Sequence, residues 1–173
     1  LAAMVANLTV GKAGYESAWA SSSSLAERAQ EVKAALLRAV DDDTRAFDDV
    51  LAAMRLPRLS EEEKRTRETA LAAAYEVATA VPLATARLCL QALELAEEAA
   101  VTGNRNSASD AGVGALLAKA GLDAAILNVR INLPSVREGK FKIASLAEVA
   151  ELQVKSASPL ARTLAAVDAG LKG

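Results

Sequence analysis

The carboxylates of Asp41, Asp42 and Asp43 are a first group in this sequence that could carry acid–base chemistry. A helix directs consecutive side chains about 100° apart, so the three carboxylates cannot share one environment. Asp43 stands four and seven residues before Phe47 and Val50, which directs it towards the apolar side of a helix. A carboxylate on that side needs a partner or takes a raised pKa, and either state suits a general acid or base. A solvated helix face or a cap is the alternative for all three.

Lys12 follows Gly11 at the end of the first apolar segment, and Thr9 precedes it by about one turn. An ammonium group there would fix an anion or donate a proton, and Thr9 would line the same pocket. The alternative is a lysine that stays in water and complements the dipole at the end of a helix. Lys12 is therefore a candidate proton donor, with Thr9 and Gly11 as candidate substrate contacts.

Residues 106–134 form the most apolar helical segment, yet they carry polar groups near both ends. Eighteen residues make five helical turns, so Asp110 and Asn128 point the same way about 27 Å apart, and Asn132 extends this face. Between them the face holds mostly small residues, namely Gly114, Leu117, Gly121 and Ala124 or Ala125. This pattern indicates either a close helix crossing, with Asp110 as a cap, or a ligand site whose walls are the polar ends.

The composition removes several kinds of chemistry. Histidine is absent and Cys89 is the only cysteine, so we predict no metal site, no intramolecular disulfide and no histidine base. Basic and acidic residues, 20 and 22 in number, are interspersed, which is not typical of nucleic-acid binding. The opening apolar run of ten residues is far shorter than the roughly 20 that span a membrane. We expect a cytoplasmic protein with no membrane segment and no nucleic-acid partner.

Helical spacing of apolar residues runs through the chain, whereas strand-like alternation is nowhere sustained. A first helix is predicted from Leu1 to about Val10, and we expect its true beginning to lie upstream. A second helix covers residues 25–54 and ends before Pro57. The serines at 21–24 are its cap or exposed start, and a linker is the alternative.

Ser60 and Glu63 match a capping box, which predicts the start of a third helix. Pro82 is expected to start or kink the next segment, which stops at residues 102–104.

The same cap pattern recurs at Ser107 and Asp110, ahead of a helix that reaches about Leu133. A last helix is predicted for residues 145–169, with a bend at Pro159. These segments predict an all-α fold: a single-domain bundle of long antiparallel helices.

Six phrases occur in a fixed order and together resemble one family. They are MVANLTVGK (4–12), VDDDTRAFDDVLAAMRLP (40–57), EEEKRTR (61–67), VPL (81–83), GNRNSASD (103–110) and NVRINLP (128–134). The sequence resembles the formimidoyltetrahydrofolate cyclodeaminase family, which also contains stand-alone bacterial methenyltetrahydrofolate cyclohydrolases. The resemblance covers essentially the whole chain.

The resemblance implies an all-helical subunit that forms a homodimer and binds a tetrahydrofolate derivative near the subunit contact, without a metal or nicotinamide cofactor. It also implies family counterparts for Gly11, Lys12, Asp43, Phe47, Asn104, Asp110, Asn128 and Asn132. Members of the family carry a glycine- and serine-rich loop of the PTPGGGS kind ahead of the first helix. We therefore expect residues 1–173 to form one domain that lacks this loop.

Two reactions of this family share one carbon. In the cyclohydrolase reaction, water attacks the methenyl bridge between N5 and N10 of tetrahydrofolate, and the adduct opens to 10-formyltetrahydrofolate. In the cyclodeaminase reaction, N10 attacks the formimidoyl carbon on N5, and ammonia leaves. Both need a carboxylate beside a cationic centre, so Asp43 or Asp110 is the expected general base. Lys12 is the expected proton donor, or the anchor of the substrate's glutamate.

The expected substrate contacts are Thr9, Gly11, Asn104, Asn128 and Asn132, with the last two orienting the pterin through their amides. Since no formimidoyltransferase segment is visible on the chain, we expect a cyclohydrolase. The alternatives are a cyclodeaminase and, in another class, a non-catalytic helical dimer that binds folate or a protein partner.

Overall fold

The computed structural model describes residues 1–171 of the 173-residue chain. Within them lie five α-helices and no strand, which confirms the all-α prediction. The helices are α1 (Ala2–Asn7), α2 (Trp19–Met54), α3 (Glu61–Thr102), α4 (Ala108–Asn132) and α5 (Lys140–Leu171). Three short 3-10 turns join them: η1 (Glu16–Ala18), η2 (Arg105–Ser107) and η3 (Leu133–Ser135).

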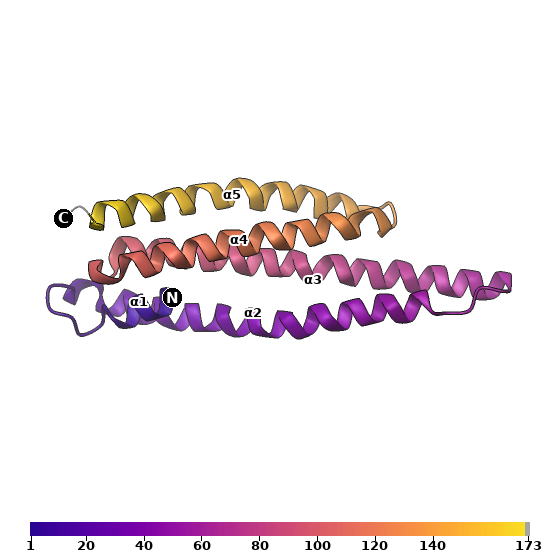
Figure 1. Cartoon of the computed structure of the whole chain (residues 1–173), viewed down its shortest axis with the longest axis horizontal. Coiled ribbons are helices and arrows are strands. Elements are labelled where there is room, and N and C mark those ends of the chain that lie inside the picture. Colours follow the sequence, from indigo (N-terminus) through magenta and orange to yellow (C-terminus); the bar gives the residue numbers. More distant parts are fainter. Residues whose placement is uncertain (172–173) are drawn as a thin grey trace.

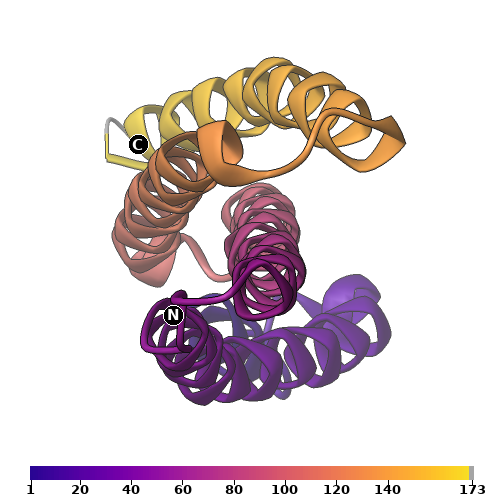
Figure 2. The ribbon, with the colours of Figure 1, turned by 90° about the vertical axis from the view of Figure 1, so that its right-hand side faces the viewer.

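Helices α2 to α5 run along the length of the molecule, and each is antiparallel to the next one in the chain. Together they form an elongated bundle (Figure 1). Helix α3 is central: it packs against α2, α4 and α5, and the end-on view shows it between α2 and the other two (Figure 2). The short α1 packs beside α2 near one end of the bundle. Any groove between α2 and α4 therefore has α3 as its floor.

Helix α3 begins where the sequence predicts and then continues further than expected. The Ser60 hydroxyl accepts a hydrogen bond from the Glu63 N–H at 3.1 Å, and the Glu63 carboxylate accepts from the Ser60 N–H at 2.9 Å, which confirms the capping box. Pro82 neither starts nor ends a helix, because α3 continues through it to Thr102.

Other helix limits differ from the predicted ones. The serines at 21–24 lie inside the first turns of α2, where Ser22 is buried and the other three are exposed, so they start the helix and are not a linker. Helix α5 begins at Lys140, five residues before the predicted start at Ser145, and continues through Pro159. Ser107 precedes α4, but its hydroxyl donates to the Asn104 carbonyl at 2.9 Å and caps no N–H of the helix. The second predicted capping box is therefore wrong.

Aliphatic side chains make up the core, as the scarcity of aromatic residues requires. The largest of the fully buried apolar residues are Val5, Leu25, Leu93, Leu122, Ile126 and Val129. Helices α3 and α4 approach closely because Gly121 has no side chain: a Cβ there would lie 3.1 Å from the Cys89 Sγ. Ion pairs to α3 from the neighbouring helices join Arg28 to Glu98, Arg87 to Glu148 and Arg162 to Glu97.

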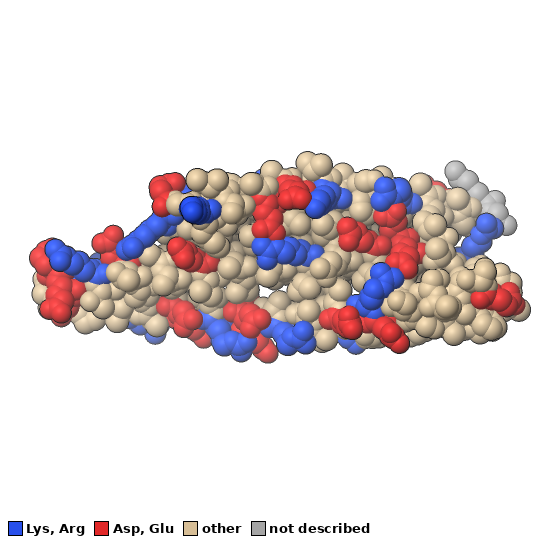
Figure 3. Space-filling model, turned by 180° about the vertical axis from the view of Figure 1, so that it is seen from behind, with Lys and Arg blue, Asp and Glu red and all other residues tan. Residues whose placement is uncertain are grey.

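The surface carries two stripes of exposed apolar side chains, one on α2 and one on α4. Together they form what we call the apolar face, whose residues are each between 61% and 75% exposed: Leu37, Val40, Phe47, Leu117, Leu127 and Ile131. Patches of this kind on a folded chain mark contact sites. On the opposite side of the molecule acidic and basic residues alternate without a concentrated basic area (Figure 3).

Two helical segments, α3 and residues 105–135, are long and apolar enough to cross a membrane by length and composition alone. Only 33% of the most apolar window of each is buried within one chain. Core helices of packed bundles pass the same test, and both segments pack against other helices of this bundle. Their low burial shows instead that much apolar surface is left uncovered by a single copy.

Candidate functional site

A hollow of about 340 Å³ lies between α2, α3 and α4, and we call it the central hollow. Its volume falls within the range of small-molecule sites, about 300–1,000 Å³. The polar groups that line it come from all three helices and are Asp43, Thr44, Thr85 and Asn128. Its apolar lining consists of Leu36, Ala39, Val40, Pro82, Gly121, Ala124 and Ala125. Asp43 and Asn128 were both predicted from the sequence as site residues, and the structure brings them to one cavity.

The polar lining of the central hollow offers mainly hydrogen-bond acceptors. The Thr44 hydroxyl donates to the Val40 carbonyl at 3.0 Å, and the Thr85 hydroxyl donates to the Val81 carbonyl at 3.1 Å. Because their protons are engaged, both hydroxyl oxygens face the hollow as acceptors only. Asp43 is the one charged residue among those that line it. An electron-poor or cationic group is therefore favoured there over an anion.

Local helical geometry explains how these residues meet. On α4 the hollow is lined by Gly121, Ala124, Ala125 and Asn128, at the three- and four-residue spacing of one helix face. This is the middle of the stripe predicted from Asp110 to Asn132. Three of these four residues are small, so the groove between α2 and α4 stays open above α3.

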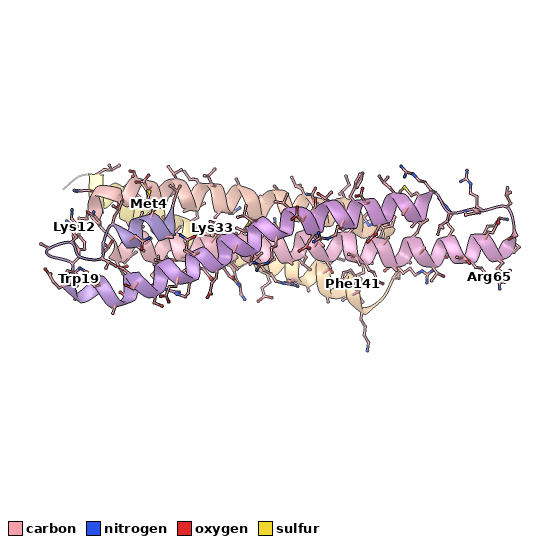
Figure 4. The ribbon with its side chains drawn as sticks, turned by 90° about the horizontal axis from the view of Figure 1, so that it is seen from below. Met4, Lys12, Trp19, Lys33, Arg65 and Phe141 are labelled. Atoms are coloured by element: carbon pink, nitrogen blue, oxygen red, sulfur yellow. The ribbon has the colours of Figure 1, made fainter. Side chains whose placement is uncertain are left out.

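A second and larger hollow of about 660 Å³ adjoins the central one, with Leu36 lining both. We call it the N-terminal hollow, since α1, α2, α3 and α4 line it at the N-terminal end of α2. Its lining is mostly aliphatic, with Asn7, Gln30 and Lys33 as the polar members. Lys33 lies on α2, well removed from Lys12 in the α1–α2 connection (Figure 4).

Lys33 was not among the site residues predicted from the sequence. A weak signal was present: Lys33 precedes Asp43 by ten residues, about 2.8 helical turns, which leaves the two side chains about 80° apart around the axis of α2.

Four other predicted site residues meet at one end of the bundle. We call this group the end cluster: Thr9, Gly11, Lys12 and Asn104. The buried Thr9 hydroxyl donates to the Val5 carbonyl at 2.8 Å and accepts from the Asn104 N–H at 2.8 Å. The Asn104 amide donates to the Leu8 carbonyl at 3.3 Å. Thr9 and Asn104 thus tie the α1–α2 connection to the α3–α4 connection, and Gly11 takes a positive φ of 77° in the first of these.

Lys12 belongs to the same end of the molecule, where the Trp19 indole N–H donates to its carbonyl at 3.3 Å (Figure 4). Trp19 begins α2 and Asp43 follows it 24 residues later, which corresponds to about 36 Å along the helix axis. Lys12 and Asp43 therefore cannot act on the same reacting carbon within one chain.

Asp110 is half-buried in the first turn of α4, six residues after Asn104, and so lies towards the end cluster. Its spacing of 18 residues from Asn128 corresponds to about 27 Å, as predicted. Asp43 is accordingly the predicted carboxylate that lies in the central hollow, and Asp110 is not.

The last two polar residues of NVRINLP have protein partners. Asn132 donates from its amide to the Ala78 carbonyl of α3 at 2.7 Å, one turn beyond the hollow. Arg130 lies off this face and donates to the Gln153 side chain of α5 at 3.0 Å. Among residues 1–171, no three acidic or cysteine side chains are grouped as metal ligands.

Comparison with known proteins identifies the family. The family model described as formiminotransferase-cyclodeaminase matches residues 1–151. A methenyltetrahydrofolate cyclohydrolase of Methylorubrum extorquens is 40% identical over 149 residues, which cover 86% of this chain and 72% of that protein. A formimidoyltransferase-cyclodeaminase of Sus scrofa is 36% identical over 159 residues, which cover 88% of this chain and 29% of the longer protein.

The fold agrees with this relationship. The crystal structure of a formiminotetrahydrofolate cyclodeaminase from Thermotoga maritima superposes with a TM-score of 0.85 at 28% identity. The match covers 97% of this chain and 80% of that one. The chain therefore belongs to the formiminotransferase-cyclodeaminase family.

Proposed function

We propose that this protein is a folate one-carbon enzyme that hydrolyses 5,10-methenyltetrahydrofolate to 10-formyltetrahydrofolate in the central hollow. The observation that carries this proposal is the 40% identity to a methenyltetrahydrofolate cyclohydrolase, which spans 72% of that relative. The match to the mammalian bifunctional relative spans only 29% of its length.

The acceptor-lined hollow supports this chemistry. The methenyl bridge carries a positive charge, and the Asp43 carboxylate would stabilise it while directing water to the bridging carbon. Asp43 then accepts one proton as the C–O bond forms. The adduct's hydroxyl then loses its proton as the C=O bond forms, and the N5–C bond breaks with its electron pair going to N5. N5 takes up a proton, and the formyl group stays on N10. One water is consumed and one proton is released, so the reaction is balanced without a metal or nicotinamide cofactor.

The rest of the substrate fits the two adjoining hollows. The Asn128 amide offers both a donor and an acceptor to the edge of the pterin. The aliphatic N-terminal hollow suits the aromatic ring that links the pterin to glutamate. Lys33 precedes Asp43 by ten residues, about 15 Å along α2, and would pair with the glutamate carboxylate. We therefore assign this anchoring role to Lys33 in place of Lys12.

The apolar face supports a homodimer. Val40 and Ala124 line the central hollow, and exposed apolar residues continue their faces seven residues away: Phe47 on α2, and Leu117 and Ile131 on α4. A second copy would cover these side chains and close the hollow from solvent. A twofold axis midway along α2 would also bring the end cluster of one copy, with Lys12, towards the central hollow of the other. We place the dimer in the cytoplasm.

Formimidoyltetrahydrofolate cyclodeamination is the second candidate, because the superposed structure from Thermotoga maritima has that activity in its name. It would use the same hollow: N10 attacks the formimidoyl carbon, and ammonia leaves with a proton. The two reactions differ in what the enzyme delivers to the carbon, a water molecule in one and N10 in the other.

Parallel assays on the purified protein test the proposal. One follows the loss of methenyltetrahydrofolate absorbance above the spontaneous rate, and the other follows ammonia release from formimidoyltetrahydrofolate. We expect methenyl hydrolysis, and we expect Asp43→Asn to lower kcat about 10²–10⁴-fold. Asp41→Asn, an exposed neighbour outside the hollow, is the matched control and should leave kcat unchanged.

Ammonia release alone would make the protein a cyclodeaminase, and silence in both assays would overturn the proposed function. Full turnover by Asp43→Asn would remove Asp43 from its role. Mixing the Asp43→Asn and Lys12→Met variants distinguishes a site within one chain from a site shared by two chains. Recovered turnover in the mixture supports a site completed by the second copy.

A further inference from the structure

Pro82 interrupts the hydrogen-bond ladder of α3 at the wall of the central hollow. Proline has no backbone N–H, so the carbonyl four residues earlier, that of Ala78, loses its helical donor. Both residues lie inside the 42-residue helix, and Pro82 is buried. A carbonyl that is shielded from water and lacks a donor is costly, which is one reason why proline in the middle of a helix usually bends or ends it.

The missing donor is supplied from another helix. The Asn132 amide, at the last residue of α4, donates to the Ala78 carbonyl at 2.7 Å. The two residues are 54 positions apart in the chain, and both are half-buried. The length is at the short end of the range for N–H···O hydrogen bonds, and the acceptor is the one carbonyl that Pro82 leaves free.

We propose that Asn132 is a positioning residue: its amide replaces the backbone donor that Pro82 lacks and thereby sets the width of the central hollow. Pro82 lines one wall of that hollow from α3, and Asn128, one turn before Asn132, lines another from α4. The bond between Asn132 and Ala78 therefore fixes the spacing of the two helices at the point where they face the substrate.

This inference rests on the proposed function for its effect on catalysis but not for its effect on the fold. It also changes the role predicted for Asn132. From the sequence, both amides of NVRINLP were expected to contact the pterin, whereas in the structure only Asn128 lines the central hollow. Asn128 faces the hollow, and Asn132 acts through α3.

A double-mutant cycle on the full chain tests the bond. Asn132→Ala leaves the Ala78 carbonyl without a donor, so we expect the unfolding equilibrium constant in urea to rise about tenfold to a hundredfold. In the Pro82→Ala background, residue 82 regains an N–H for that carbonyl. There we expect Asn132→Ala to change the constant by less than about threefold. An equal change in both backgrounds would overturn the proposal.

Asn132→Asp provides a second test that needs no change at Pro82. The ionised carboxylate has the shape of the amide but no donor, whereas the protonated carboxyl donates again. We expect the stability deficit of this variant to be large at pH 7 and to shrink as the pH falls towards about 4. A deficit that is equal at both pH values contradicts the proposed bond.

Enzyme activity distinguishes a positioning role for Asn132 from a purely structural one. We expect kcat/KM for methenyltetrahydrofolate to fall about tenfold to a hundredfold in Asn132→Ala, since small displacements in a site are costly. The double variant should recover the kcat/KM of Pro82→Ala alone. If the two substitutions are coupled in their effects on stability but the double variant does not recover the kcat/KM of Pro82→Ala, the positioning role is overturned. Absence of turnover in the parent protein refutes the proposed function, and the urea cycle still decides the bond.

Discussion

A charge placed on the apolar face should separate two copies without unfolding either one. Leu117 on α4 is the test position, because it is 65% exposed in the single chain and lines neither hollow. Full burial of a leucine side chain contributes about 1.5–3 kcal/mol, so covering the exposed part contributes about 1–2 kcal/mol. A twofold interface contains the residue twice, which makes about 2–4 kcal/mol per dimer. Leu117→Glu should therefore weaken the dimer about 30- to 700-fold in Kd, and burying the new charge would add to this.

Sedimentation velocity over a dilution series measures this change, and thermal unfolding at a fixed low concentration checks the fold. The matched control is Val154→Glu on α5, which is 77% exposed and lies away from the apolar face. We expect the control to keep the parent Kd. A parent protein that is monomeric at high concentration, or an equal loss in both variants, would show that the apolar face is not the subunit contact.

Two further predictions concern the single chain. The Arg87 guanidinium lowers the pKa of Glu148, so this pair stabilises the fold above the ordinary glutamate pKa and loses that effect as the pH falls through the lowered value. Glu148→Gln should lower Tm at pH 7 and flatten the fall of Tm between about pH 5 and 3, as followed by circular dichroism; an unchanged profile would contradict the pair. Gly103→Ala should lower Tm sharply, since its Cβ would lie 2.4 Å from the Ala99 carbonyl oxygen, whereas Gly139→Ala meets nothing within 4 Å and should not.

Local patterns in the sequence were sufficient to predict the hydrogen bonds that a side chain makes within its own helical turn. The capping box at Ser60 and Glu63 is confirmed because both of its hydrogen bonds join residues three apart. The predicted helix start at Pro82 was wrong for the opposite reason. The donor that allows α3 to continue comes from Asn132, and no local pattern connects the two positions.

The candidate site was likewise predictable only in part. Helical periodicity placed Asn128 on the same face as Gly121, and this face lines the central hollow. It could not show that Asp43 meets this face while Lys12 does not, since the register between separate helices depends on tertiary packing. About 36 Å of α2 lies between these two predicted partners. The single site expected from the sequence is therefore two separate groups within one chain, the end cluster and the central hollow.

The hydrogen bond from the Trp19 indole to the Lys12 carbonyl has an optical consequence. Trp19 is the only tryptophan in the sequence, and it is half-buried at the start of α2. Its emission therefore reports on the end cluster alone, while far-ultraviolet circular dichroism reports on the long helices. If the α1–α2 connection opens before the bundle melts, the fluorescence transition will precede the dichroic one in the same denaturant series. Wild-type protein thus carries a built-in probe for the mobility of the end that is proposed to meet a second copy.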